Sequence, residues 1–129
     1  MAPTRDTRRL LADETGAVAV IVAATMTAIM VLAAVVVDMG MAYTVRRQCQ
    51  AAADAGALAG CQALINGTDP DVEARDYTMR NAVKPAEGLT ITNVEVGADY
   101  VKVEVSRPSP TTFGKVAGVD EIPVTASAK

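Results

Sequence analysis

The sequence contains no histidine and few aromatic residues. Of its 129 residues, 50% are hydrophobic but only 3% are aromatic. Without histidine, the chain has no Ser-His-Asp triad, no histidine general base and no histidine-ligated metal. Its two cysteines cannot form a four-ligand zinc site on their own. We therefore expect no enzyme activity, cofactor, metal or small-molecule substrate, and an apolar content concentrated in one part of the chain.

The charges do not indicate a nucleic-acid partner. The net charge of −3 comes from residues 66–129, which carry seven basic and ten acidic side chains, whereas residues 1–15 and 16–65 each sum to zero. Nucleic-acid binding needs clustered positive charge, and this pattern excludes it.

One long apolar segment dominates the N-terminal half. Residues 16–37, GAVAVIVAATMTAIMVLAAVVV, contain no charge. As a helix they extend roughly 33 Å, which is enough to cross a bilayer. The alternative of a cleaved signal peptide predicts a shorter apolar run followed by a small-x-small site. We predict a single-pass transmembrane helix after a cytoplasmic segment, residues 1–15, because three arginines precede the span and two follow it.

The residues after the span predict a membrane exit followed by a second helical stretch. Asp38, Gly40 and Tyr43 form a membrane-exit motif, in which Asp38 is expected to reach the interface. Residues 38–65 lack proline and are rich in alanine, so the helix should continue to about Ile65.

Small residues recur on one face of this extension. Ala52, Gly56 and Gly60 are spaced four apart and form a helix-packing stripe. Interior glycines cost about 1 kcal/mol each relative to alanine, so close packing against another element should offset that cost. Both the chain's own C-terminal module and a partner subunit remain open as the element that covers the stripe.

The two cysteines lie on the same extension. Cys49 and Cys61 would be roughly 18 Å apart in a straight helix, too far for a bond between them. The alternatives are two buried thiols or an intermolecular disulfide. The LAGC sequence that ends at Cys61 has the form of a lipobox, but charged residues precede it where an apolar segment is required.

Residues 66–129 predict a small α+β module outside the membrane. Asn66-Gly67 predicts a turn, and Asp69-Pro70 predicts the start of a helix from about 70 to 83. Acidic residues here fit the first turns of that helix better than a catalytic cluster. Alternating apolar residues predict two strands in 89–107. We expect a short helix that starts at Ser109 or Pro110 and ends at Gly118. The last strand is expected over 121–128, at an edge of the sheet because it contains proline.

The stretch from TGAVAVIVAATMTAIMVLAAVVVDMGMAY to RRQCQAAADAGALAGCQAL resembles the TadE/TadG-like proteins of bacterial Tad (Flp) pilus assembly. The segment PSPTTFGKVAGVDEIPVTASA resembles the C-terminal part of that family more weakly. Pseudopilin members are cut after a glycine and carry glutamate at the fifth mature position. If Gly16 were that glycine, Ile21 would be the fifth residue, which looks more like the unprocessed TadG-like branch.

The resemblance implies a structural protein of the bacterial cytoplasmic membrane, anchored by one helix, that supports pilus assembly or a related secretion apparatus. Its partners would be the lipid bilayer and other pilus-assembly proteins or further copies of itself. The alternative is a pilin-like or pseudopilin subunit that packs into a filament through its N-terminal helix.

Overall fold

The computed structural model describes residues 14–82 and 88–129. Two helices are followed by three strands, with a short 3-10 helix before the last strand. The elements are α2 (Glu14–Asn66), α3 (Pro70–Arg80), β1 (Thr90–Val96), β2 (Val101–Pro110), η1 (Gly114–Ala117) and β3 (Glu121–Ala128). The chain divides into two compact units, Met1–Val36 and Val37–Lys129. The expected α+β class is confirmed.

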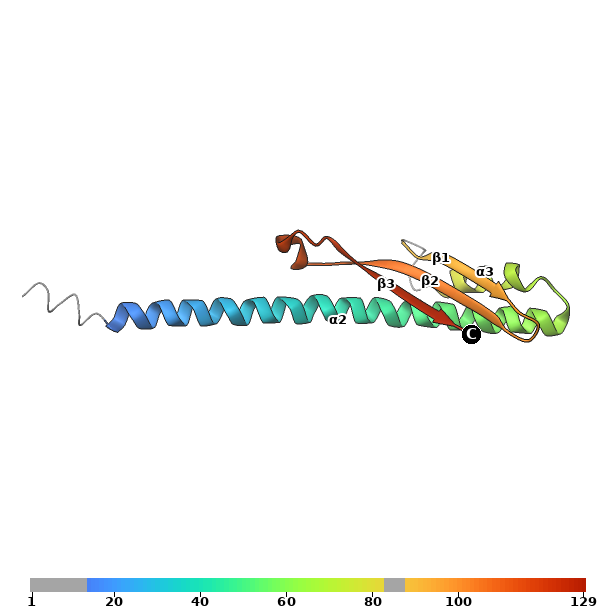
Figure 1. Cartoon of the computed structure of the whole chain (residues 1–129), viewed down its shortest axis with the longest axis horizontal. Coiled ribbons are helices and arrows are strands. Elements are labelled where there is room, and N and C mark those ends of the chain that lie inside the picture. Colours follow the sequence, from blue (N-terminus) through green and yellow to red (C-terminus); the bar gives the residue numbers. More distant parts are fainter. Residues whose placement is uncertain (1–13, 83–87) are drawn as a thin grey trace, which may run out of the picture. The chain divides into compact units, whose positions relative to one another are not determined.

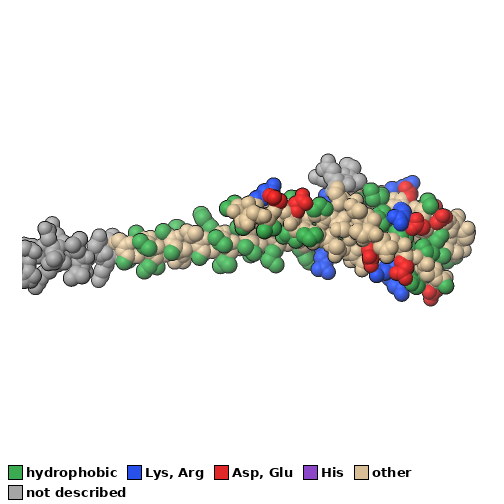
Figure 2. Space-filling model, turned by 45° about the horizontal axis from the view of Figure 1, so that its top comes forward, with side chains coloured by type: hydrophobic (Ala, Val, Ile, Leu, Met, Phe, Trp, Pro, Cys, Tyr) green, Lys and Arg blue, Asp and Glu red, His purple; other side chains and the backbone are tan. Residues whose placement is uncertain are grey.

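The described part of the first unit is the apolar portion of α2. Its side chains are exposed almost throughout residues 16–36, and α2 is long and apolar enough to cross a membrane. Figure 2 shows that charged side chains gather on the second unit instead. The hydroxyls of Thr25 and Thr27 donate to the carbonyls of Ile21 and Ala23 at 2.8 and 2.9 Å. Both hydroxyls are therefore bonded within the helix itself.

Local signals end α2 and start α3. Gly67 has φ of +73° and the Thr68 N–H donates to the Ala63 carbonyl at 3.0 Å, which closes α2 with a left-handed cap. Asp69 caps α3 by accepting from the N–H groups of Asp71 and Val72. The predicted turn and helix start are confirmed. α3 ends at Arg80, earlier than the predicted residue 83, which lies outside the described residues.

The second unit contains an antiparallel sheet in the order β1-β2-β3. Figure 1 shows this sheet alongside the part of α2 that belongs to the second unit. One face of the sheet presents three fully buried valines, Val101, Val103 and Val105, to α2 and α3. Small residues supply much of the opposing surface, so the elements approach closely despite the scarcity of aromatic side chains. The core consists of Cys49, Ala52, Ala53, Ala57, Ala74, Leu89, the three valines and Ala126.

The predicted helix start at Ser109 or Pro110 is wrong. Both residues belong to β2, where they pair with Ile122 and Glu121 of β3. The short helix is η1, which begins at Gly114 and ends before Gly118, the expected stop. Beyond Ser106, β2 has no partner in β1, so prolines are tolerated on that side of the strand.

Candidate functional site

Asp38, the first residue after the apolar run, is held by the turn that leads into η1. Its carboxylate accepts three consecutive backbone N–H groups: Thr112 at 2.8 Å, Phe113 at 3.1 Å and Gly114 at 2.7 Å. Successive N–H groups that converge in this way form a small anion-binding concavity. The side chain is almost fully buried, with 8% of its surface exposed. Asp38 therefore joins the start of the second unit's portion of α2 to a loop 74 residues further along the chain.

These hydrogen bonds set the charge state of Asp38. The N–H of Thr112 lowers the pKa of the carboxyl below its ordinary value, and the N–H groups of Gly114 and Phe113 act in the same direction. Burial opposes the shift but does not overcome it. The side chain is a carboxylate at neutral pH, and its charge is satisfied by main-chain donors.

The other two residues of the predicted exit motif make no comparable contact. An added methyl group at Gly40 would meet nothing within 4 Å, and the Gly40 carbonyl accepts from the Thr44 hydroxyl at 3.0 Å. Tyr43 is exposed. The sequence singled out Asp38 as a residue that reaches the membrane interface, not as an acceptor for a loop, and it contained no signal for Thr112, Phe113 and Gly114, because main-chain donors leave no mark in composition.

The small-residue stripe faces other elements of the second unit. Ala52 is fully buried. A Cβ atom at Gly56 would lie 2.8 Å from the Ala74 carbonyl oxygen and would also collide with Thr78 Oγ1. A Cβ atom at Gly60 would lie 2.7 Å from Val101 Cγ1. Thus α3 covers Gly56 and β2 covers Gly60.

The two cysteines differ in exposure, and both are free thiols. Cys49 is fully buried in the core, whereas Cys61 is half-buried. Burial raises the pKa of the Cys49 thiol, and the positive charge of Arg107 partly opposes this. Cys49 is therefore the less reactive thiol.

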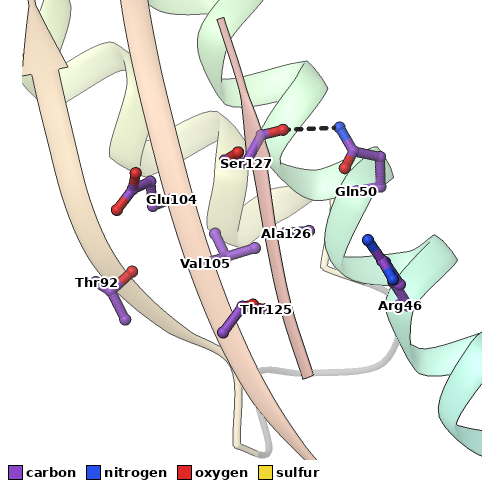
Figure 3. Close-up of a pocket in the computed structure, with 8 residues that line it drawn as sticks. All are labelled: Arg46, Gln50, Thr92, Glu104, Val105, Thr125, Ala126 and Ser127. Atoms are coloured by element: carbon purple, nitrogen blue, oxygen red, sulfur yellow. Dashed lines mark hydrogen bonds between the residues drawn. The ribbon is translucent and has the colours of Figure 1, made fainter. Parts of the chain in front are cut away.

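A shallow groove lies between α2 and the sheet. Arg46 and Gln50 of α2 border it, and Gln50 Nε2 donates to the Ser127 carbonyl at 3.1 Å (Figure 3). The single carboxylate lining the groove is that of Glu104, whose Oε1 lies 2.6 Å from Lys102 Nζ. The Glu104 carboxylate is therefore already engaged in an ion pair.

The fold and these contacts define an α+β protein with one apolar helix long enough to cross a membrane and a small unit packed on that helix's continuation. Residues 16–75 match the family model described as "Putative Flp pilus-assembly TadE/G-like". The match runs from Gly16 through the whole small-residue stripe into α3 and covers just under half of the chain. Neither the search of curated proteins nor that of solved structures finds a match.

Proposed function

We propose that this protein is a membrane-anchored structural component of a bacterial Tad (Flp)-type pilus assembly or secretion apparatus. The observation that carries the proposal is the family match, because residues 16–75 include both the apolar helix and the stripe on which the second unit packs. The role is non-enzymatic: the conspicuous contacts join elements of the chain to one another. The partners are the lipid bilayer and other pilus-assembly proteins or further copies of this chain.

In this proposal α2 crosses the cytoplasmic membrane once through residues 16–37. Residues 1–15 lie in the cytoplasm, while residues 38–65 and the α+β module 66–129 lie outside. The support is the charge of the flanks, with three arginines before the span and Arg46 and Arg47 after it.

We further propose that the protein resembles the unprocessed TadG-like branch. Cleavage after Gly16 would place Ile21 where pseudopilins carry glutamate. The intact mass of the protein isolated from its native membrane separates the two roles. Retention of Met1 supports an accessory component, and loss of residues 1–16 supports the alternative of a pilin-like filament subunit.

Contact with a partner requires a surface other than the small-residue stripe, since the stripe is covered within the chain. On α2, Leu58 and Ile65 are 74% and 80% exposed and are seven residues apart, which places them on one outward face. Both are suitable positions for a photo-crosslinking residue.

The test is photo-crosslinking at Leu58 in intact cells that assemble the pilus. A product whose mass matches a pilus component or a second copy supports the proposal. Cells that make this protein without the other pilus components are the control. If neither Leu58 nor Ile65 yields a product specific to the apparatus, the proposed role is wrong.

An intermolecular disulfide, if copies meet, would use Cys61 more readily than Cys49. Cys61 retains exposed surface, whereas Cys49 becomes accessible only when the second unit opens. A non-reducing gel of the Cys61→Ser and Cys49→Ser variants measures this directly, and loss of a dimer band only in Cys61→Ser is the expected result.

A further inference from the structure

The long strand β2 leads towards the end of the second unit that contains Val37 and Asp38, where the apolar run of α2 ends. Val101 lies against Gly60, Arg107 Nη1 donates to Gln48 Oε1 at 3.3 Å, and Thr112 donates to Asp38. Along these three contacts the residue numbers of α2 fall while those of β2 and the following loop rise, so the helix and the strand are antiparallel. The distances along the two elements agree: the twelve helical residues from Gly60 to Gln48 extend about 18 Å, and the six strand residues from Val101 to Arg107 extend about 20 Å.

The strand ends in a turn that we call the exit loop, residues 112–119. The Thr111 N–H donates to the Asp120 carbonyl at 3.0 Å and closes the base of the loop. Figure 1 shows this turn at the opposite end of the second unit from α3. The exit loop therefore lies where the second unit meets the first residues after the apolar run.

Apolar side chains at the tip of the exit loop point away from the core. Val116 is 91% exposed, and Phe113 and Val119 are each 47% exposed. The only phenylalanine of the sequence is thus half-exposed beside an almost fully exposed valine, and this apolar surface is not covered by the described residues 14–82 and 88–129. Such surface marks a site that is covered by something else.

The backbone of the exit loop is suited to a medium poor in water. Its N–H groups at residues 112, 113 and 114 are bonded to Asp38. Those of Val116, Gly118 and Val119 donate to carbonyls within the loop at 2.9 to 3.1 Å. Most of the loop's donors are thus satisfied internally, which lowers the cost of moving the tip out of water.

The identity of the covering partner follows from the position of Asp38. Asp38 directly follows Val37, the last of the 22 uncharged residues, and its carboxylate holds the start of the exit loop. One residue of helix rise is only about 1.5 Å, so the loop lies at the level where the apolar run ends. A bilayer crossed by that run presents its interfacial region at this level.

We propose that the exit loop inserts Phe113, Val116 and Val119 into the outer interfacial region of the bilayer that α2 crosses. This inference rests on the proposed membrane anchoring of α2. Lys115, between the apolar residues, extends its charged group towards the lipid headgroups. Asp38 then has a defined role as the clamp that keeps the loop at the membrane surface.

The chain contains no tryptophan, so one introduced indole reports on its own surroundings. The full chain with Val116→Trp is reconstituted into phosphatidylcholine vesicles whose acyl chains carry bromine near the headgroup. Because Val116 is 91% exposed, the substitution leaves the core intact. The expected result is a shift of emission to shorter wavelength and quenching by the brominated lipid.

Two matched variants distinguish the possible failures. Val72→Trp, on the exposed side of α3, should be unquenched, and Ile29→Trp, within the apolar run, should be quenched by deeply placed bromine. Quenching of Ile29→Trp without quenching of Val116→Trp overturns the loop proposal alone. Absence of quenching in Ile29→Trp overturns the anchoring and the loop proposal together. Equal quenching of Val116→Trp and Val72→Trp overturns insertion by the loop, because the whole unit would then contact lipid.

Discussion

The substitution Gly56→Ala tests whether α3 packs directly on the small-residue stripe. The added Cβ atom would lie 2.8 Å from the carbonyl oxygen of Ala74 and even closer to Thr78 Oγ1. Thr78 is fully buried, and its hydroxyl already donates to the Ala74 carbonyl at 2.7 Å. Rotation of Thr78 would leave the backbone contact in place, so α3 itself has to move.

The expected magnitude combines two opposing effects. Alanine is better than glycine inside a helix by about 1 kcal/mol. Overpacking a close interface costs typically about 1–3 kcal/mol, and a contact with immobile backbone belongs at the upper end. Gly56→Ala should therefore lower the free energy of unfolding of the second unit by about 2 kcal/mol, when the propensity gain of about 1 kcal/mol is allowed for.

The buried thiol of Cys49 provides the assay. In a Cys61→Ser background, Cys49 is the single thiol, and its alkylation requires the second unit to open. A loss of about 2 kcal/mol corresponds to alkylation roughly 30-fold faster at constant pH, when opening is in rapid equilibrium. The full chain is measured in detergent micelles.

Gly40→Ala is the matched control, since an added methyl group there meets nothing within 4 Å. It should be neutral or stabilising by up to about 1 kcal/mol. Thr78→Ala should couple to Gly56→Ala, because it removes the nearest colliding atom. If Gly56→Ala alkylates no faster than Gly40→Ala, then α3 does not pack on Gly56 and the reasoning is refuted.

Three further predictions concern other contacts of the second unit. Gly60→Ala should lower the free energy of unfolding by up to about 2 kcal/mol, after the same propensity gain is subtracted, because Val101 Cγ1 would lie 2.7 Å from the new methyl group. Val101→Ala should offset part of that loss, and strictly additive losses in the same alkylation assay would contradict this. Ser109 is 1% exposed and its hydroxyl has no hydrogen-bond partner among the described residues. Ser109→Ala should therefore raise the free energy of unfolding by about 1 kcal/mol in denaturant titrations, whereas a lower free energy of unfolding would indicate a bonded hydroxyl. The Asp38 pKa is lowered in the folded chain, so the stability from Asp38 is fully present above its ordinary pKa of 3.8 and is lost as pH falls below that value. The protection factor of the Thr112 amide, which compares its exchange with that of an unfolded amide at the same pH, should fall there and in Asp38→Asn, and an unchanged protection factor in Asp38→Asn would contradict the clamp.

Local signals allowed much of the fold to be predicted. Composition alone marks the apolar run and the alanine-rich extension, and α2 reaches Asn66, one residue past the predicted end. Asn66-Gly67 and Asp69-Pro70 act on the backbone within a few residues of themselves, so their effects could be read directly. The alternation of Val101, Val103 and Val105 likewise predicted the buried face of β2.

The end of β2 could not be predicted from local signals. Ser109 and Pro110 are good helix starters, yet pairing with β3 carries the strand through both residues. The first strand stops pairing at Ser106, so the prolines of β2 interrupt no ladder on that side. Tertiary pairing therefore overrode the local preference.

The sequence by itself determined where an apolar helix runs, where it ends and which of its faces carries small residues, because these depend on residues close together in the chain. The tertiary structure alone decided that α3 covers Gly56, that β2 covers Gly60, and that Asp38 holds the exit loop. Those contacts join segments up to 76 residues apart, and two of them use main-chain groups: the N–H groups that Asp38 accepts and the Ala74 carbonyl against Gly56. Every residue type except proline carries both groups, so no pattern of side chains reveals which of them will meet.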